Sequence, residues 1–204
     1  MTKALIIISP TNIDLKNFEK NYFIVGVERG CLELIKQNIN IDLAISDFDQ
    51  VSKAEKELIK LKTKEYIELN PEKYYLDGIS ALEELKKRKY DDITMIVNPS
   101  KRYDMNLSIL EYVFNYNLTI LNDDSIIFKL NPGKNILNFN NFQEFTYVSF
   151  FAKENLKISI KNLKYEVDDL FLIAYSTRAF SNCFIPYKNA IITLDKELIV
   201  IMTK

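Results

Sequence analysis

The amino-acid sequence predicts an α/β domain built on a three-layer, mainly parallel sheet, followed by an all-β sandwich or barrel. Two observations support this prediction. Up to about residue 124, short apolar runs alternate with helical patterns, as expected for a parallel sheet covered on both faces. From residue 125 onward, short apolar runs are separated by Asn, Asp, Gly and Pro, which is typical of antiparallel sheets. We therefore divide the chain into domains spanning residues 1–124 and 125–204.

The first domain is predicted to alternate strands with helices. Continuous apolar runs predict strands at 5–8, 23–27, 43–45, 93–97 and 118–121, with a further strand near 66–69. Apolar residues at helical spacing predict helices across 31–38, 58–61, 79–85 and 107–114. Ser52 and Glu55 have the S-x-x-E spacing of a capping box, so the second of these helices should begin there. This alternation predicts a Rossmann-like sheet.

The second domain shows no helical period. Its predicted strands are 126–128, 147–150, 157–160, 190–193 and 198–201. No Gly- or Ser-rich linker separates it from the first domain, so we expect the two domains to pack closely.

The composition excludes several classes of protein. Lys and Arg number 27 against 28 Asp and Glu, so there is no broad basic surface to hold nucleic acid. The absence of histidine excludes His-dependent triads and His-ligated zinc. The 4 glycines cannot form a G-x-G-x-x-G fingerprint or a P-loop. Any chemistry must therefore rest on carboxylates, hydroxyls, amides, Lys and Arg.

The apolar segments and the cysteines indicate a cytoplasmic protein. No apolar stretch approaches the roughly 20 residues that a membrane-spanning helix needs, and the first apolar run is too short for a signal peptide. Cys31 and Cys183 lie far apart among apolar neighbours, as expected for two separate thiols in a reducing compartment.

The strongest local signal for chemistry is the segment Ser46–Asp49, which directly follows the predicted strand 43–45. Ligands of parallel sheets bind outside the carboxyl ends of the strands. At such an end, Asp47 and Asp49 could both reach a hard cation such as Mg²⁺, which prefers oxygen ligands. The alternative is a polar turn that only ends the strand.

Two further acidic residues occupy comparable positions. Asp77 and Asp104 each precede a predicted helix, where a carboxylate can act as an N-cap. A helix N-terminus is also a place where phosphates bind. Arg102 stands two residues before Asp104, and its guanidinium could grip phosphate oxygens. We expect the junctions that carry Asp47 and Asp49, Asp77, and Asp104 to converge on one edge of the sheet and form a magnesium–nucleotide site.

The order of these segments resembles the thiamin pyrophosphokinase (thiamin diphosphokinase) family over nearly the whole chain. Members carry Asp-Gly-Gly, Gly-Asp-Phe-Asp-Ser, Lys-Asp-x-Thr-Asp and Gly-Gly-Arg-x-Asp-His elements, then Gly-Leu-Lys-Tyr and Ser-Asn-Glu in a β domain. The corresponding segments here are Glu28–Gly30, Ser46–Gln50, Lys73–Asp77, Ser100–Met105, Asn162–Tyr165 and Ser181–Cys183. The shared order of six partial matches is more specific than any single one.

The resemblance implies a transferase that moves a pyrophosphoryl group from ATP, its co-substrate, to the hydroxyl of thiamin, with Mg²⁺ as cofactor. It also implies a nucleotide-binding catalytic domain, a thiamin-binding β domain, and a homodimer with the vitamin at the interface. The implied catalytic residues are Asp49, Asp77 and Asp104, and the implied metal ligands are Asp47, Asp49 and Asp77. Arg102, Asp47 and Lys73 would bind ATP and its phosphates, and Ser181 and Asn182 would contact thiamin.

Several positions depart from the family pattern. They are Glu28, Tyr74, Leu76, Ser100, Lys101, Met105 and Cys183. Two alternatives therefore stay open: a module that binds a nucleotide or thiamin with weakened catalysis, and a related pyrophosphokinase for another alcohol. Without the resemblance, Ser181 and Asn182 could simply form a turn. Tyr165, Tyr175 and Phe180 could stack on the cationic thiamin ring or simply pack in the core.

Overall fold

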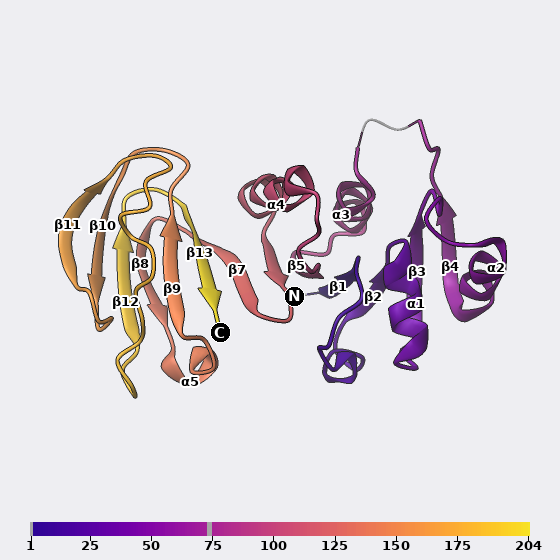
Figure 1. Ribbon diagram of the computed structural model, residues 1–204, viewed down its shortest axis with the longest axis horizontal. Coiled ribbons are helices and arrows are strands. Elements are labelled where there is room, and N and C mark those ends of the chain that lie inside the picture. Colours follow the sequence, from indigo (N-terminus) through magenta and orange to yellow (C-terminus); the bar gives the residue numbers. More distant parts are fainter. Residues whose placement is uncertain (1, 73–74) are drawn as a thin grey trace. The chain divides into compact units, whose positions relative to one another are not determined.

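The computed structural model describes residues 2–72 and 75–204. The chain forms two compact units, each described by itself below (Figure 1). The first unit contains the residues up to Tyr112 together with Asn117–Asp123. The second contains Val113–Tyr116 and Asp124–Lys204.

The first unit is built on parallel strands in the order β4-β3-β2-β1-β5-β6. The strands are β1 (Lys3–Ile7), β2 (Phe23–Gly26), β3 (Ile41–Ser46), β4 (Thr63–Glu68), β5 (Asp92–Ile96) and β6 (Leu118–Leu121). The helices are η1 (Leu15–Asn17), α1 (Arg29–Lys36), α2 (Lys53–Lys62), α3 (Asp77–Lys87) and α4 (Tyr103–Asn115). The predicted α/β class with a mainly parallel sheet is confirmed, as is the capping box at Ser52 and Glu55 that opens α2.

Both faces of this sheet are covered. On β1, Leu5 and Ile7 pack in one core cluster with Cys31 and Leu34 of α1. Successive strand residues point to opposite faces, and the intervening Ile6 is completely buried as well. This explains why the central strands appear in the sequence as continuous apolar runs.

The order of the strands creates a switch point at β1. From β1 the chain builds β2, β3 and β4 outward on one side, and then returns to place β5 and β6 on the other side. The loops that follow β1 and β5 therefore leave the sheet in different directions. Such a point, at the carboxyl ends of parallel strands, is where α/β sheets bind ligands.

The second unit is an antiparallel sandwich, as the sequence predicts. Its strands are β7 (Ser125–Leu130), β8 (Gly133–Leu137), β9 (Tyr147–Phe151), β10 (Leu156–Lys161), β11 (Val167–Leu172), β12 (Ala190–Leu194) and β13 (Leu198–Thr203), with a short helix α5 (Phe139–Phe142). They pair in the orders β7-β13-β9 and β11-β10-β12-β8. One core cluster joins both sets of strands, including Phe150 from the first set and Ile158 from the second.

The two cysteines are separate free thiols, as expected, but Cys183 is only partly buried, whereas both were expected to be buried. Cys31 is buried, and burial raises the pKa of its thiol to about 12, so the unreactive thiol form prevails at neutral pH. Within the described ranges, no helix has both the length and the apolar character needed to cross a membrane.

At Gly30, the start of α1 lies close against the end of β1. A Cβ atom there would lie 1.9 Å from the carbonyl oxygen of Ile7 at the end of β1, so the backbone would have to shift. We expect Gly30→Ala to lower the free energy of unfolding by about 3 kcal/mol or more, measured by urea denaturation.

Gly78 in α3 provides the matched control. A Cβ atom at this position would lie 3.0 Å from Cδ1 of Ile8, the end of a flexible side chain. Alanine also favours the helix by about 1 kcal/mol, so Gly78→Ala should stay within about 1 kcal/mol of the wild type. Equal stability of the two variants would contradict this account of how α1 packs.

Candidate active site

Three carboxylates come together at the carboxyl edge of the first unit's sheet. Glu28 lies just beyond β2, Asp47 directly follows β3, and Asp77 is the first residue of α3. One oxygen from each side chain lies within 4.8 Å of the others. Asp47 and Asp77 are residues that the sequence predicts for this site, whereas Glu28 enters the prediction only as a departure from a family motif.

The carboxylate of Glu28 is held in place from two directions. The residue is only 7% exposed. The hydroxyl of Ser46 donates to Oε1, and the backbone N–H of Gln50 donates to Oε2 at 3.3 Å. Glu28 itself precedes α1 with φ 49° and ψ −126°, a region that residues with a Cβ rarely adopt. Backbone strain of this kind persists where the surroundings impose it, and it is frequent at functional sites.

The electrostatics of this group favour a bound cation. Burial raises the pKa of the Glu28 carboxyl, and the neighbouring Asp77 and Asp47 raise this pKa further. The hydrogen bonds from Ser46 and Gln50 lower the pKa but do not cancel the increase. Asp77 Oδ1 is likewise screened from solvent. Oxygen donors of this type fit a hard divalent ion such as Mg²⁺, whose charge would relieve the repulsion among them.

Phe48 anchors the turn between Asp47 and Asp49. Its ring is buried and stacks on Tyr66, with ring centroids 4.7 Å apart and an interplanar angle of 16°. Its backbone is left-handed, with φ 56°. Asp47 belongs to the carboxylate group, whereas Asp49 is exposed and is not one of the three, and its backbone N–H donates to Asp47 Oδ1 at 3.4 Å. The assignment of Asp49 as a metal ligand stays a prediction.

Arg102 and Asp104 pair with each other in an exposed position. The guanidinium forms an ion pair with the Asp104 carboxylate and holds the pKa of that group below its usual value. Asp104 lies in the first turn of α4 and is not among the three grouped carboxylates. Both aspartates proposed as N-caps lie within their helices: α3 has Leu76 as its N-cap, and α4 begins at Tyr103. Lys73, which was also predicted to bind phosphates, lies outside the described residues, as does Tyr74.

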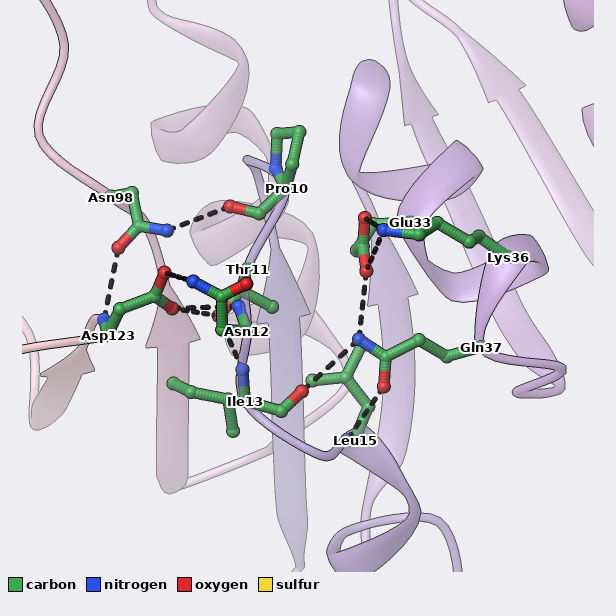
Figure 2. A network of polar contacts seen from close by, with 10 residues as sticks. All are labelled: Pro10, Thr11, Asn12, Ile13, Leu15, Glu33, Lys36, Gln37, Asn98 and Asp123. Atoms are coloured by element: carbon green, nitrogen blue, oxygen red, sulfur yellow. Dashed lines mark hydrogen bonds and ion pairs between the residues drawn. The ribbon is translucent and has the colours of Figure 1, made fainter.

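The loops after β1, β5 and β6 are joined by a polar network centred on Asp123 (Figure 2). The Asp123 carboxylate accepts hydrogen bonds from Thr11 Oγ1 at 2.5 Å, from the backbone N–H of Asn12 at 3.0 Å and from Asn12 Nδ2 at 2.8 Å. Its own backbone N–H donates to Asn98 Oδ1 at 3.0 Å. Burial acts against the charged form of Asp123, but these hydrogen bonds outweigh it and lower the pKa. The switch point is therefore fixed by side chains.

The other side of the β1 loop is tied to α1 (Figure 2). Gln37 accepts from the backbone N–H of Leu15 at 3.0 Å and donates to the carbonyl of Ile13 at 3.2 Å. Gln37 also donates to Glu33 Oε1 at 2.8 Å, which gives this buried carboxylate a partner. The segment between β1 and β2 is thus held on both sides.

In the second unit, a small pocket of about 90 Å³ lies beside the predicted thiamin residues, and Tyr165, Arg178, Phe180 and Asn182 contribute to its lining. Asn182 is buried, and its side chain binds the main chain of Tyr165 at both ends: Oδ1 accepts from the N–H at 3.0 Å, and Nδ2 donates to the carbonyl at 2.8 Å. Ser181 is exposed and left-handed, with φ 58°. Asn182 therefore lines this pocket and fixes Tyr165, whereas Ser181 is its neighbour in sequence and is not one of the lining residues.

Comparisons with known proteins agree with this arrangement. A sequence model described as the catalytic domain of thiamin pyrophosphokinase matches residues 15–122, and one described as its vitamin B1 binding domain matches residues 134–199. A search of curated proteins gives no match to this sequence.

The fold is similar to that of several solved structures. A thiamin pyrophosphokinase family protein from Enterococcus faecalis is 24% identical, with a TM-score of 0.86 over 100% of this chain and 99% of the other. Thiamine pyrophosphokinase from Bacillus subtilis is 19% identical, with a TM-score of 0.87 over 100% and 99%. The enzyme from Candida albicans is 15% identical, with a TM-score of 0.85 over 100% and 89%.

The network at the switch point can be tested by exchanging the two side chains that face each other, Asn12 and Asp123. Asn12→Asp would place two carboxylates together, and Asp123→Asn would place two amide groups together, so each variant should lose about 1 to 2 kcal/mol of stability. The double variant restores a donor facing an acceptor and should return to within about 1 kcal/mol of the wild type. Additive losses in chemical denaturation would contradict the network.

The same variants predict a dependence on pH. Because the folded protein lowers the pKa of Asp123, the carboxylate stabilises the fold at neutral pH, and this contribution is lost as the pH falls through the lowered pKa. The difference in unfolding free energy between the wild type and Asp123→Asn should therefore be constant near neutrality and shrink below about pH 4. A difference that grows on acidification would exclude this role of the Asp123 charge.

Proposed function

Because the chain belongs to the thiamin pyrophosphokinase family, a class of enzymes, we propose that it transfers a pyrophosphoryl group from ATP to the hydroxyl of thiamin, giving thiamin diphosphate and AMP. The observation that carries the proposal is the group formed by Glu28, Asp47 and Asp77, which lies inside the region that matches the family's catalytic domain. The thiamin half of the site would lie in the second unit, whose sequence matches the vitamin-binding domain.

In this proposal Glu28, Asp47 and Asp77 hold a magnesium ion. Their oxygens suit Mg²⁺ in type and number, since this ion is usually bound through a few carboxylates and completes its shell with water and phosphate oxygens. When bound, Mg²⁺ neutralises charge on the phosphate oxygens and makes the β-phosphorus easier to attack. Asp49 remains a candidate ligand for the same ion or for a water bound to it.

Arg102 would act on the phosphate oxygens, and Asp104 would act on the thiamin hydroxyl. Arg102 is exposed, and its guanidinium could replace some of its contacts with Asp104 by contacts with phosphate oxygens. Asp104 keeps a lowered pKa beside the guanidinium, so it is ionised at neutral pH and is a weak base. Its proposed role is to accept a hydrogen bond from the thiamin hydroxyl and orient it, since positioning contributes more here than proton removal.

The thiamin ring would bind at the pocket of the second unit. Tyr165 and Phe180 line that pocket and could stack on the cationic ring, while the Ser181 hydroxyl could reach its polar edge. Asn182 would act by holding Tyr165 in place. We also propose a homodimer, because Phe171, Ile173 and Tyr175 leave more than half of their surface exposed in the single chain.

The activity is tested by AMP release from ATP in the presence of Mg²⁺ and thiamin. We expect release that requires both thiamin and the metal. ATP or thiamin binding without release would indicate a binding module instead. AMP release with another alcohol, but not with thiamin, would indicate a different pyrophosphokinase.

The metal assignment predicts opposite changes in activity and stability. Glu28→Gln, Asp47→Asn and Asp77→Asn should each lower kcat/KM by about 100-fold or more, equivalent to about 2.7 kcal/mol of transition-state stabilisation. In the absence of Mg²⁺ these variants should unfold at equal or higher denaturant concentration, because each removes one of the mutually repelling charges. Asp49→Asn changes an exposed residue outside the group and should lose less activity than these three variants. Full activity of Glu28→Gln would contradict the assignment.

A further inference from the structure

The loop that carries Arg102 is held by side chains on both sides of Pro99. This segment, residues 97–102 and called the Arg102 loop below, connects the end of β5 to the start of α4. It contains no glycine, and neither Ser100 nor Lys101 has a left-handed backbone. The conformation of the Arg102 loop therefore depends on its contacts and not on unusual backbone freedom.

Asn106, in α4, clamps Ser100 through both of its amide atoms. The backbone N–H of Ser100 donates to Asn106 Oδ1 at 2.9 Å, and Asn106 Nδ2 donates to the Ser100 carbonyl at 2.9 Å. Inside this closed segment, the backbone N–H of Arg102 donates to the Ser100 hydroxyl oxygen at 3.1 Å. One side chain thus satisfies both main-chain polar groups of one residue and encloses Arg102 and Asp104 in a short ring of backbone.

Asn98 fixes the beginning of the same loop. Its backbone N–H donates to Ser9 Oγ at 2.7 Å, and its Nδ2 donates to the carbonyl of Pro10 at 2.8 Å. Its Oδ1 accepts the N–H of Asp123, so the Asn98 amide is tied to the network at the switch point (Figure 2). Between these two asparagines, the main chain leading to Arg102 has little freedom.

We propose that Asn106 is a positioning residue for nucleotide binding: by clamping Ser100 it holds Arg102 ready to meet phosphate oxygens. This inference rests on the proposed function. Ordering a loop residue costs conformational entropy, and a loop that is ordered before the ligand arrives avoids that cost during binding. Loss of the clamp should therefore weaken ATP binding more than it slows the transfer step.

A purely structural role for Asn106 makes a different prediction, because it would change stability alone. Asn117, just beyond the opposite end of α4, provides the matched control: its Nδ2 donates to the carbonyl of Asp91 at 3.0 Å, which lies outside the Arg102 loop. Asn106→Ala and Asn117→Ala each remove an asparagine that binds the main chain. Neither variant changes the group formed by Glu28, Asp47 and Asp77.

The test compares these variants with Asn98→Ala in steady-state kinetics and amide hydrogen exchange. We expect Asn106→Ala to raise the KM for ATP about tenfold and to change kcat less than threefold. Asn98→Ala should shift the KM for ATP in the same direction and decides the question if Asn106→Ala does not fold. The Ser100 amide should exchange at least tenfold faster in Asn106→Ala and at the wild-type rate in Asn117→Ala.

The failure of this inference differs from the failure of the proposed function. An active wild type in which Asn106→Ala and Asn117→Ala have the same KM for ATP would overturn the positioning role. A wild type without AMP release would remove the proposed function, and the positioning role with it. Unchanged exchange of the Ser100 amide in Asn106→Ala would overturn the clamp whatever the activity.

Discussion

The mutual repulsion of Glu28, Asp47 and Asp77 is the constraint on which the first unit's site depends. Their oxygens lie within 4.8 Å of one another, and Glu28 is buried, which disfavours its charge further. Hydrogen bonds from Ser46 and Gln50 offset part of this cost. A divalent cation would offset much of the rest, so the arrangement is one that binding of metal and phosphates can use.

The sheet supplies the geometry that this constraint requires. Parallel strands bring loops that are distant in sequence to one edge, and Gly30 allows α1 to begin directly against the end of β1. The loops on the far side of the switch point have no comparable charge cluster in the described residues. Instead, Asp123, Asn98 and Asn106 hold them through hydrogen bonds to the main chain. The part of the sheet's carboxyl edge next to β2 and β3 is thus suited to a cation. The part next to β5 holds the loop of Arg102 in place.

The sequence predicts the central elements better than the peripheral ones, for physical reasons. Buried strands leave continuous apolar runs, and the capping box leaves a local signature at Ser52. By contrast, β8 and β11 were not predicted: each is an edge strand of its sheet, with exposed residues such as Lys134 and Asp168 that break up the apolar pattern. Glu28 was not predicted as a ligand, although it follows the buried strand 23–27 much as Asp47 follows 43–45. The same strand-end argument applied to β2 would have found it.

The most direct measurement is a crystal structure with Mn²⁺ in place of Mg²⁺ and a non-hydrolysable ATP analogue, in which anomalous scattering locates the ion. The account predicts an ion coordinated by oxygens of Glu28, Asp47 and Asp77, with the phosphates between it and Arg102. An ion bound only by Asp49 or Asp104, with the three grouped carboxylates unchanged and empty, would contradict it.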